Sequence, residues 1–195
     1  MKNKTLEIIS KRRSIRKYKK EQISDEKLSL IVEAGRLAPS GGNNQTSHFI
    51  VIQNRETLEE LKSVVEREFA KMEIKEDTYK SIKNSILASK KGGYNFTYDA
   101  PTLIVAANQK EYGNAMADCS VALENMMLAA VSLDIGSCWI NQLHWLDDNK
   151  YVREYMLKLG LSKDETICGG LALGYPQMSQ MAPLKRTGNT VTYVK

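Results

Sequence analysis

A basic segment near the start of the chain, residues 12–16, has the sequence Arg-Arg-Ser-Ile-Arg and contains side chains that bind anions. Arginine offers planar, permanently charged donors that match phosphate oxygens, and serine adds a hydroxyl donor. If the segment is extended, alternate residues point the same way, so Arg12, Ser14 and Arg16 could line one face of an anion site. The alternative is a solvated basic run at the end of a helix. Because such runs are common, the segment alone favours that alternative.

The positive charge of the chain is concentrated in its first 20 residues. The net charge at pH 7 is +5, and residues 1–20 hold nine Lys or Arg and one Glu, so the other 175 residues carry a net charge of −3. A protein that binds nucleic acid needs a broader basic face, preferably with aromatic side chains interleaved. A concentrated patch instead suits one small polyanion, of which phosphate is the commonest. Lys185 and Arg186 form a second basic pair that could complete the site.

A second polar segment, residues 40–45, lies between a predicted helix and a predicted strand. Ser24 is suited to cap the helix that starts at Asp25, and Pro39 stops that helix. The run that follows, Ser-Gly-Gly-Asn-Asn-Gln, is rich in residues that tolerate unusual backbone angles. Residues 48–53 then have the apolar character of a buried strand. The sequence therefore predicts a loop at 40–45 between two regular elements.

The remaining elements predict one domain of mixed α and β structure over residues 1–195. Helices are expected at 5–12, about 58–65, about 114–134 and 147–159, and further strands at 102–108, 137–142, 166–173 and 190–194. The long helix at 114–134 has an apolar face broad enough for burial against more than one neighbour, including another subunit. Residues 66–97 are charged with weak periodicity, and we expect them to form a surface excursion or cap.

Several other kinds of site are not favoured. Only two histidines are present, and neither has carboxylates at metal-ligand spacing, so no metal is expected. The sequence has no Gly-x-Ser-x-Gly elbow, P-loop or dinucleotide-binding glycine pattern. It has no apolar run near the ~20 residues of a membrane span, and its start lacks the apolar core of a signal peptide. Cys119, Cys138 and Cys168 are odd in number and widely spaced, which favours reduced core thiols and a cytoplasmic location.

Five segments, in a fixed order, resemble those of the nitroreductase family. They are the basic segment at 12–16, Ala-Pro-Ser-Gly-Gly-Asn-Asn-Gln at 38–45, Asp-Ala-Pro at 99–101, Gly-Ser-Cys-Trp-Ile at 136–140, and Leu-Gly-Tyr-Pro at 173–176 before the second basic pair. Each segment is modestly specific. Together, in the family's order and spread over roughly residues 8–194, they make chance a poor explanation.

The resemblance implies an α+β fold with a central mixed, mainly antiparallel sheet flanked by helices. It also implies a homodimer with FMN at the subunit interface, in which the C-terminal strand extends the partner's sheet. The basic segment would bind the ribityl phosphate and nearby polar edge of FMN, the 39–45 loop would reach the flavin from the partner chain, and the strand at 137–140 would lie beside the isoalloxazine ring. The implied FMN-binding residues are Arg12, Arg13, Ser14, Arg16, Pro39, Ser40, Asn43, Gln45, Ser137, Cys138, Trp139, Lys185 and Arg186.

The activity that the resemblance implies is flavin-dependent oxidoreduction. NAD(P)H would pass a hydride to flavin N5 and leave, and a nitroaromatic, quinone or similar small oxidant would take its place in a ping-pong reaction. Because the flavin supplies this chemistry, no catalytic side chain is assigned. The alternatives are a sister activity on the same scaffold (reductive dehalogenation, flavin fragmentation or ene reduction) and a non-catalytic protein that sequesters FMN.

The sequence departs from the family's pattern at two places near the implied site. Thr46-Ser47 stands where many members have Pro-Trp or a similar pair, and Asn141 stands where many have Gly. The first departure puts the usual packing beside the flavin in doubt and could widen the substrate entrance.

Overall fold

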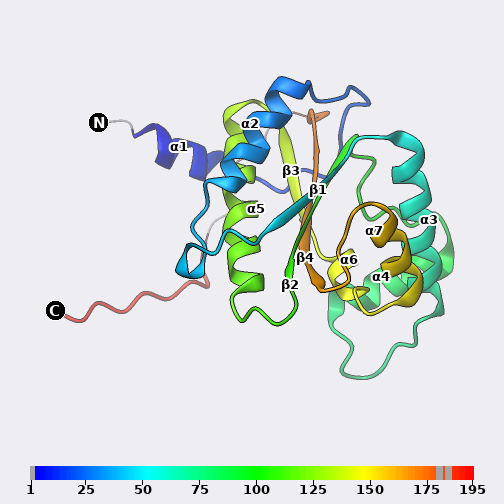
Figure 1. The fold of residues 1–195 in the computed structure, drawn as a ribbon. Helices are drawn as coiled ribbons and strands as arrows, with labels where there is room; N and C mark the ends of the chain where they lie inside the picture. The colour runs from blue at the N-terminus through cyan, green and yellow to red at the C-terminus, as the bar shows by residue number, and fades with distance from the viewer. Residues whose placement is uncertain (1–2, 179–181, 183–185) are drawn as a thin grey trace.

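The computed structural model describes residues 3–178, 182 and 186–195 (Figure 1). Within these residues the centre is a four-stranded sheet with the order β1-β2-β4-β3. Its strands are β1 (His48–Ile52), β2 (Thr102–Gln109), β3 (Gly136–Ile140) and β4 (Glu165–Gly174). All three neighbouring pairs are antiparallel. The predicted α+β class is confirmed, and the described sheet is antiparallel throughout rather than mixed.

Helices cover both sides of the sheet (Figure 1). On one side lie α1 (Lys4–Lys11), α2 (Asp25–Arg36) and α5 (Ala115–Ser132); on the other lie α3 (Arg55–Lys71), α4 (Lys80–Lys91), α6 (Gln142–Trp145) and α7 (Lys150–Lys158). Successive side chains of β2 alternate between the two sides, because a strand has a period of two. Leu103 and Val105 join the core under α3, whereas Ile104 and Ala106 join the core under α5. Burial on both faces explains why β2 is a nearly continuous apolar run.

The helix limits follow from their capping residues. The Ser24 side chain accepts a hydrogen bond from the N–H of Lys27 (3.4 Å), so the predicted cap of α2 is confirmed. Asn149 caps α7 through the N–H groups of Tyr151 and Val152 (3.0 and 3.2 Å), which starts that helix three residues later than its sequence predicts. The strand predicted at 137–142 ends at Ile140, and the short helix α6, which the sequence did not predict, follows it.

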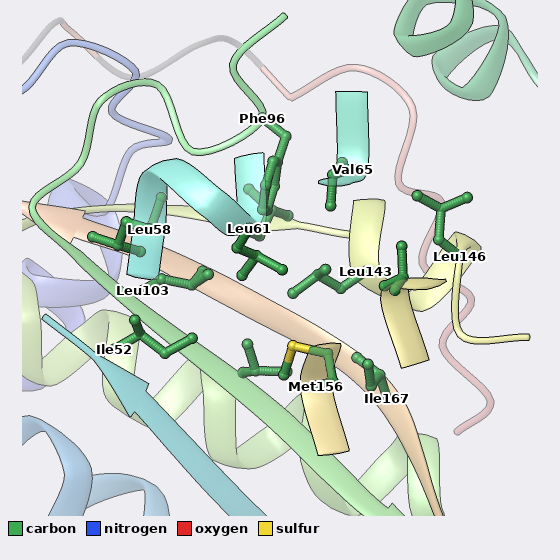
Figure 2. Packing of buried hydrophobic residues seen from close by; sticks show 14 of the residues in the cluster. Ile52, Leu58, Leu61, Val65, Phe96, Leu103, Leu143, Leu146, Met156 and Ile167 are labelled. Atoms are coloured by element: carbon green, nitrogen blue, oxygen red, sulfur yellow. The ribbon is translucent and has the colours of Figure 1, made fainter. Parts of the chain in front are cut away.

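Residues 66–97 contain the end of α3, the whole of α4 and the turns that lead to β2. Phe69, Ile86 and Phe96 are at most 1% exposed. They belong to the same core cluster as Leu61 of α3, Leu143 of α6 and Met156 of α7 (Figure 2). The segment is thus part of the packed core, which its charged sequence did not predict. A role as a cap over a site stays a prediction.

An extended segment, residues 14–22, crosses the end of the sheet; we call it the strap. The N–H of Ile15 donates to the carbonyl of Ser137 in β3 (2.9 Å), and the N–H of Lys19 donates to the carbonyl of Tyr175, just after β4 (2.8 Å). The side chain of Gln22 donates to the carbonyl of Pro101, just before β2 (3.0 Å). The strap therefore ties together the ends of three strands and places the basic segment against β3.

The last residues of the chain do not form the predicted strand. Residues 190–194 have no strand structure here and are exposed, and the tail runs away from the body of the molecule (Figure 1). No strand of the described sheet pairs with them. The pairing of this segment with a partner's sheet stays a prediction.

Candidate functional site

The basic segment starts where α1 ends and pairs at once with β3. Arg12 is the C-cap of α1 and already has an extended ψ of 130°. Two residues later, Ser14 forms a parallel β-bridge with Ser137. The basic segment therefore begins at the end of a helix, as the alternative interpretation proposed. It then continues in the extended conformation that the anion site would need. Two predicted site segments far apart in the sequence, 12–16 and 137–139, lie side by side.

The charged side chains of this segment gather around Cys138. Burial raises the pKa of the Cys138 thiol, and Arg16, the Ser14 hydroxyl and Arg12 partly oppose that rise. The thiol is 1% exposed and its nearest recorded acceptor is the carbonyl of Trp139 (3.5 Å). A neutral, buried thiol fits the structural role better than that of a nucleophile, which needs a lowered pKa. Cys138 belongs to the buried cluster that packs under α3.

The arginines differ in how their charges are compensated. Arg12 Nε lies 3.5 Å from Glu124 Oε1 of α5, in a partly exposed ion pair. The guanidinium carbon of Arg16 lies 5.7 Å from the centre of the Tyr98 ring, a cation–π contact, and no carboxylate lies within 4 Å of Arg16 among the described residues. The place where the basic segment meets β3, which we call the junction, therefore retains positive charge that the described residues of the chain do not neutralise.

Two buried polar atoms at this junction lack hydrogen-bond partners: Nε of Arg13 and the hydroxyl of Ser137. Buried polar groups are almost always paired, so an unpaired donor at the edge of a sheet needs an explanation. Both atoms belong to segments that meet at the Ser14–Ser137 bridge. An acceptor-rich ligand that reaches the junction would satisfy them.

The side chain of Trp139 is held at a fixed position on β3. Its Nε1 donates to Oδ1 of Asn141 (2.6 Å). Its ring packs against Gly169 of β4, where an added Cβ would lie 3.0 Å from the ring. Asn141, noted in the sequence as a departure from the family's pattern, thus has a defined contact: it anchors the indole.

The 40–45 loop adopts the unusual backbone predicted for it. Gly42, Asn43 and Gln45 have positive φ values of 60°, 56° and 53°, a region that asparagine and glycine tolerate better than most residues. The Ser40 hydroxyl accepts a hydrogen bond from the N–H of Gln45 (3.0 Å) and closes the loop on itself. Pro39, Asn43 and Gln45 remain exposed.

The loop is fixed to α5 of its own chain. The N–H of Gly41 donates to the Asp118 carboxylate, and the Tyr112 hydroxyl donates both to that carboxylate (2.9 Å) and to the carbonyl of Gly41 (3.0 Å). A Cβ at residue 41 would overlap the ends of the Tyr112 and Asn114 side chains, so a larger residue here would have to displace them. No hydrogen bond or ion pair in the described part of the chain joins the loop to the basic segment.

The second basic pair, Lys185 and Arg186, lies only partly within the described residues. Lys185 lies outside the described residues, and Arg186 is exposed in the tail. Their part in an anion site stays a prediction.

Several residues that shape the site were not found from the sequence. Tyr98, Glu124 and Asn141 contact predicted site residues, and Tyr112 and Asp118 contact Gly41 in the loop that carries others. In the sequence, Asp118 in the first turn of a helix resembles an ordinary capping residue. Tyr112, just before that helix, resembles an ordinary surface residue. Their partners are 71 to 77 positions away, so no local pattern could indicate them.

Comparison with known proteins decides the relationship. The pattern of the nitroreductase family matches residues 9–175, which is most of the chain. The chain belongs to the nitroreductase family. A nitroreductase relative from Archaeoglobus fulgidus, provisionally named an NADH dehydrogenase/NAD(P)H nitroreductase, is 34% identical over 176 residues, covering 88% of this chain and 85% of the relative.

Solved structures of other nitroreductases have the same fold. A nitroreductase from Bacteroides fragilis with bound FMN is 38% identical and superposes with a TM-score of 0.88, covering 99% of this chain and 100% of the other. A nitroreductase from Desulfitobacterium hafniense with bound FMN is 30% identical with a TM-score of 0.84, and each chain is covered completely.

Neither a membrane span nor a metal cluster is found among the described residues. None of their helices has the length and apolar character needed to cross a membrane. No group of three or more His, Cys, Asp or Glu among them could hold a metal ion.

Proposed function

We propose that this protein is an FMN-dependent NAD(P)H oxidoreductase that reduces a nitroaromatic, quinone or similar small oxidant. The observation that carries the proposal is the junction at Ser14 and Ser137, where two buried polar atoms lack partners beside uncompensated positive charge. A phosphate-bearing flavin supplies acceptors for both atoms and negative charge for the arginines. The FMN-bound nitroreductases of the same fold support this choice of ligand.

The residues that would hold FMN come from four segments. Arg12, Arg13, Ser14 and Arg16 would bind the phosphate and the polar edge of the ring, with Lys185 and Arg186 joining at the phosphate. Pro39, Ser40, Asn43 and Gln45 would approach from a second subunit. Ser137, Cys138 and Trp139 would form the wall beside the ring.

The open edge of β3 provides a further donor. The Ser137 carbonyl points away from β4, because it accepts from Ile15 of the strap. Backbone groups of alternate strand residues point to the same side, so the N–H of Trp139 also faces outward. The chemistry that bound FMN would supply is hydride transfer in a ping-pong exchange, from NAD(P)H to flavin N5 and then from the flavin to the oxidant. An outward N–H of β3 could donate to that nitrogen, and the permanent charge of Arg16 would stabilise a negative charge on the polar edge.

A homodimer is part of the proposal. Leu6 and Ile9 of α1 are 64% and 49% exposed, and Met116 and Val121 of α5 are 42% and 41% exposed, on the same side of the sheet (Figure 1). No residue of α1 is buried, although the helix is amphipathic. A second subunit packed on this side of the sheet would cover these exposed apolar side chains. The 40–45 loop, which does not contact its own basic segment, would then reach the partner's site.

A cytoplasmic location also belongs to the proposal. Cys119, Cys138 and Cys168 are buried and not linked by disulfides, which suits a reducing compartment.

The proposal is tested by purifying the protein, saturating it with FMN and measuring the flavin content and NAD(P)H oxidation. We expect one FMN per chain and flavin-dependent turnover with an added quinone or nitroaromatic. The variant Arg12→Gln should bind FMN about tenfold more weakly or worse, because it loses a charge-assisted contact. Arg36→Gln removes an exposed arginine of α2, paired with Glu33 at 2.7 Å, and should bind as the unmodified protein does. A protein that takes up no FMN, or that binds FMN without any turnover, would contradict the proposal.

A further inference from the structure

A second positively charged cavity lies next to the proposed flavin site, on the other side of Arg16. It has a volume of about 520 Å³ and is enclosed by the strap, the first turns of α3 and the loop before β2. Its floor is apolar, formed by the buried Tyr18, Leu58 and Ala100 with the half-buried Tyr98. This size and lining lie in the range of sites for small organic molecules.

The rim of the cavity carries charge that the described residues do not neutralise. Arg16, Lys17, Lys20 and Arg55 line it and are exposed. The two carboxylates in the lining, Glu59 and Asp99, lie 2.9 and 3.3 Å from Nζ of the buried Lys62, which is a fifth cation. No carboxylate lies within 4 Å of the four rim cations in the described part of the chain. Four positive charges around one cavity repel one another and attract an anion.

The loop that closes the cavity has a strained backbone. Tyr98 and Asp99 have positive φ values of 57° and 58°, although neither is glycine. Such conformations cost free energy and persist only where the surroundings enforce them. Here the contact of Lys62 with Asp99 and the position of Arg16 over the Tyr98 ring hold the loop against the cavity. The cavity is therefore a built feature of the fold.

We propose that this cavity is a second anion site, which binds a nucleoside phosphate separately from the flavin phosphate. The apolar floor would contact a flat base, and the four rim cations would contact phosphate groups. The inference depends on the proposed function only in placing FMN at the Ser14–Ser137 junction. The ligand could be a free nucleotide or the adenosine phosphate end of the nicotinamide donor, which share this chemistry.

The test uses the FMN-saturated protein after removal of free flavin. Adenosine 2′,5′-bisphosphate is titrated by calorimetry, with adenosine as the uncharged probe and inorganic pyrophosphate as the probe without a base. We expect one equivalent of bisphosphate to bind per chain without release of FMN, and both other probes to bind more weakly. Binding that displaces FMN, or no binding of the bisphosphate, would overturn the proposal.

Matched variants locate the site. Lys20→Gln with Arg55→Gln removes two rim charges and should weaken bisphosphate binding about tenfold or more. Lys150→Gln with Lys158→Gln makes the same charge change on α7, at two residues that do not line the cavity, and should leave binding within about twofold. Equal losses in both double variants would overturn the proposal, because the effect would then come from net charge. FMN content is measured in every variant, so failure of the flavin site is recognised separately.

Steady-state kinetics separate the two sources of the ligand. If the KM for NADPH rises in Lys20→Gln with Arg55→Gln while kcat and the KM for NADH do not, the cavity holds the phosphorylated end of the donor. If bisphosphate binding weakens but neither KM changes, the cavity holds a separate nucleotide. Both outcomes support a nucleoside phosphate site.

Discussion

The backbone N–H of Gly41 donates to both carboxylate oxygens of Asp118, at 3.1 and 3.2 Å, and so fixes the 40–45 loop onto the first turn of α5. The loop has few other anchors: its own residues are mostly exposed. A buried carboxylate that accepts from a backbone N–H and from a tyrosine makes charge-assisted hydrogen bonds, which are stronger than neutral ones. The position of the loop therefore depends largely on one side chain of α5.

The first prediction concerns this anchor. Asp118→Asn keeps the shape of the side chain but removes its charge and presents an N–H₂ group to one of the two donors. We expect the dissociation constant for FMN to rise about tenfold, in line with the loss of one charge-assisted hydrogen bond. Asp25→Asn, an exposed acid in the first turn of α2, serves as the control and should leave it unchanged. Fluorescence titration with FMN measures the dissociation constants of both variants. Equal affinities of Asp118→Asn and Asp25→Asn for FMN would contradict this role of Asp118.

The second prediction concerns Glu68 of α3, which is 3% exposed. Burial would raise the pKa of Glu68, but hydrogen bonds from Lys71 (2.7 Å), Arg67 (2.9 Å) and Asn149 (3.2 Å) lower it below its usual value. A lowered folded-state pKa stabilises the protein above the unfolded-state pKa, and that contribution is lost as pH falls through the folded-state value. Glu68→Gln should therefore destabilise the protein by about 1–3 kcal/mol at pH 7, and by much less once the pH has fallen below the lowered folded-state pKa of Glu68.

Urea unfolding of the Glu68→Gln variant at a series of pH values checks this prediction. Glu73→Gln, on an exposed residue after α3, is the control and should show little effect at any pH. A difference between wild type and Glu68→Gln that does not shrink as the pH is lowered through the acid range would show that the carboxylate charge is not responsible.

The third prediction concerns α4. Ile86 is fully buried, whereas its neighbour Leu87 is 50% exposed. Ile86→Ala should lower the free energy of unfolding by about 2–5 kcal/mol, because it leaves a cavity in the core. Leu87→Ala should change it by no more than about 0.5 kcal/mol. Chemical denaturation measures both values. Equal, small effects would mean that residues 66–97 form a separate surface layer.

The fourth prediction concerns the glycines of β4. A Cβ at residue 170 would lie 2.8 Å from the backbone oxygen of Ile104 in β2, which cannot move without disturbing the strand pairing. Gly170→Ala should therefore cost about 1–3 kcal/mol of stability or more. The added Cβ of Gly169→Ala would meet only side chains, those of Trp139 and Leu123. This variant should lose less stability than Gly170→Ala, and its Trp139 indole should shift. Thermal unfolding and tryptophan fluorescence distinguish the two; the reverse order of stability would contradict this account.

The fifth prediction concerns the exposed face of α1. Ile9→Glu places a charge on the apolar side of that helix and should convert a dimer to monomers, with loss of FMN. Leu87→Glu makes the same change on the opposite side of the sheet and should leave the dimer intact. Light scattering after size-exclusion chromatography gives the mass of each. A wild-type monomer, or a dimeric Ile9→Glu variant that keeps FMN, would show that α1 is not part of the interface.

The fold was predicted well where local patterns determine it. The cap at Ser24, the apolar runs of β1, β2 and β4, and the long apolar helix α5 all appear at or near their expected places. The structure of 66–97 was missed because its apolar residues, among them Phe69, Ile86 and Phe96, form only a weak periodic pattern in a largely charged and polar stretch. Their burial depends on contacts with α6 and α7, about 50 or more positions later.

The site was predicted in part, for a similar reason. Residue types indicated the basic segment and the loop, and the family's pattern indicated β3. The pairing of Ser14 with Ser137 needed the whole sheet to be in place before it could be seen. Supporting residues such as Asp118 and Asn141 act through hydrogen bonds set by the tertiary structure, which no spacing in the sequence records.

The strap has a consequence for how the protein is made. It joins residues near the N-terminus to residues much later in the chain: Ile15 to Ser137, Tyr18 to Pro176 and Lys19 to Tyr175. During synthesis these partners leave the ribosome long after the strap itself, so the strap must wait without its strand contacts until β4 has emerged. Contacts of such long sequence separation form late and slowly. The proposed flavin site is therefore assembled at the end of folding, and a nascent chain that stops before residue 175 would carry the arginines but could not bind the cofactor.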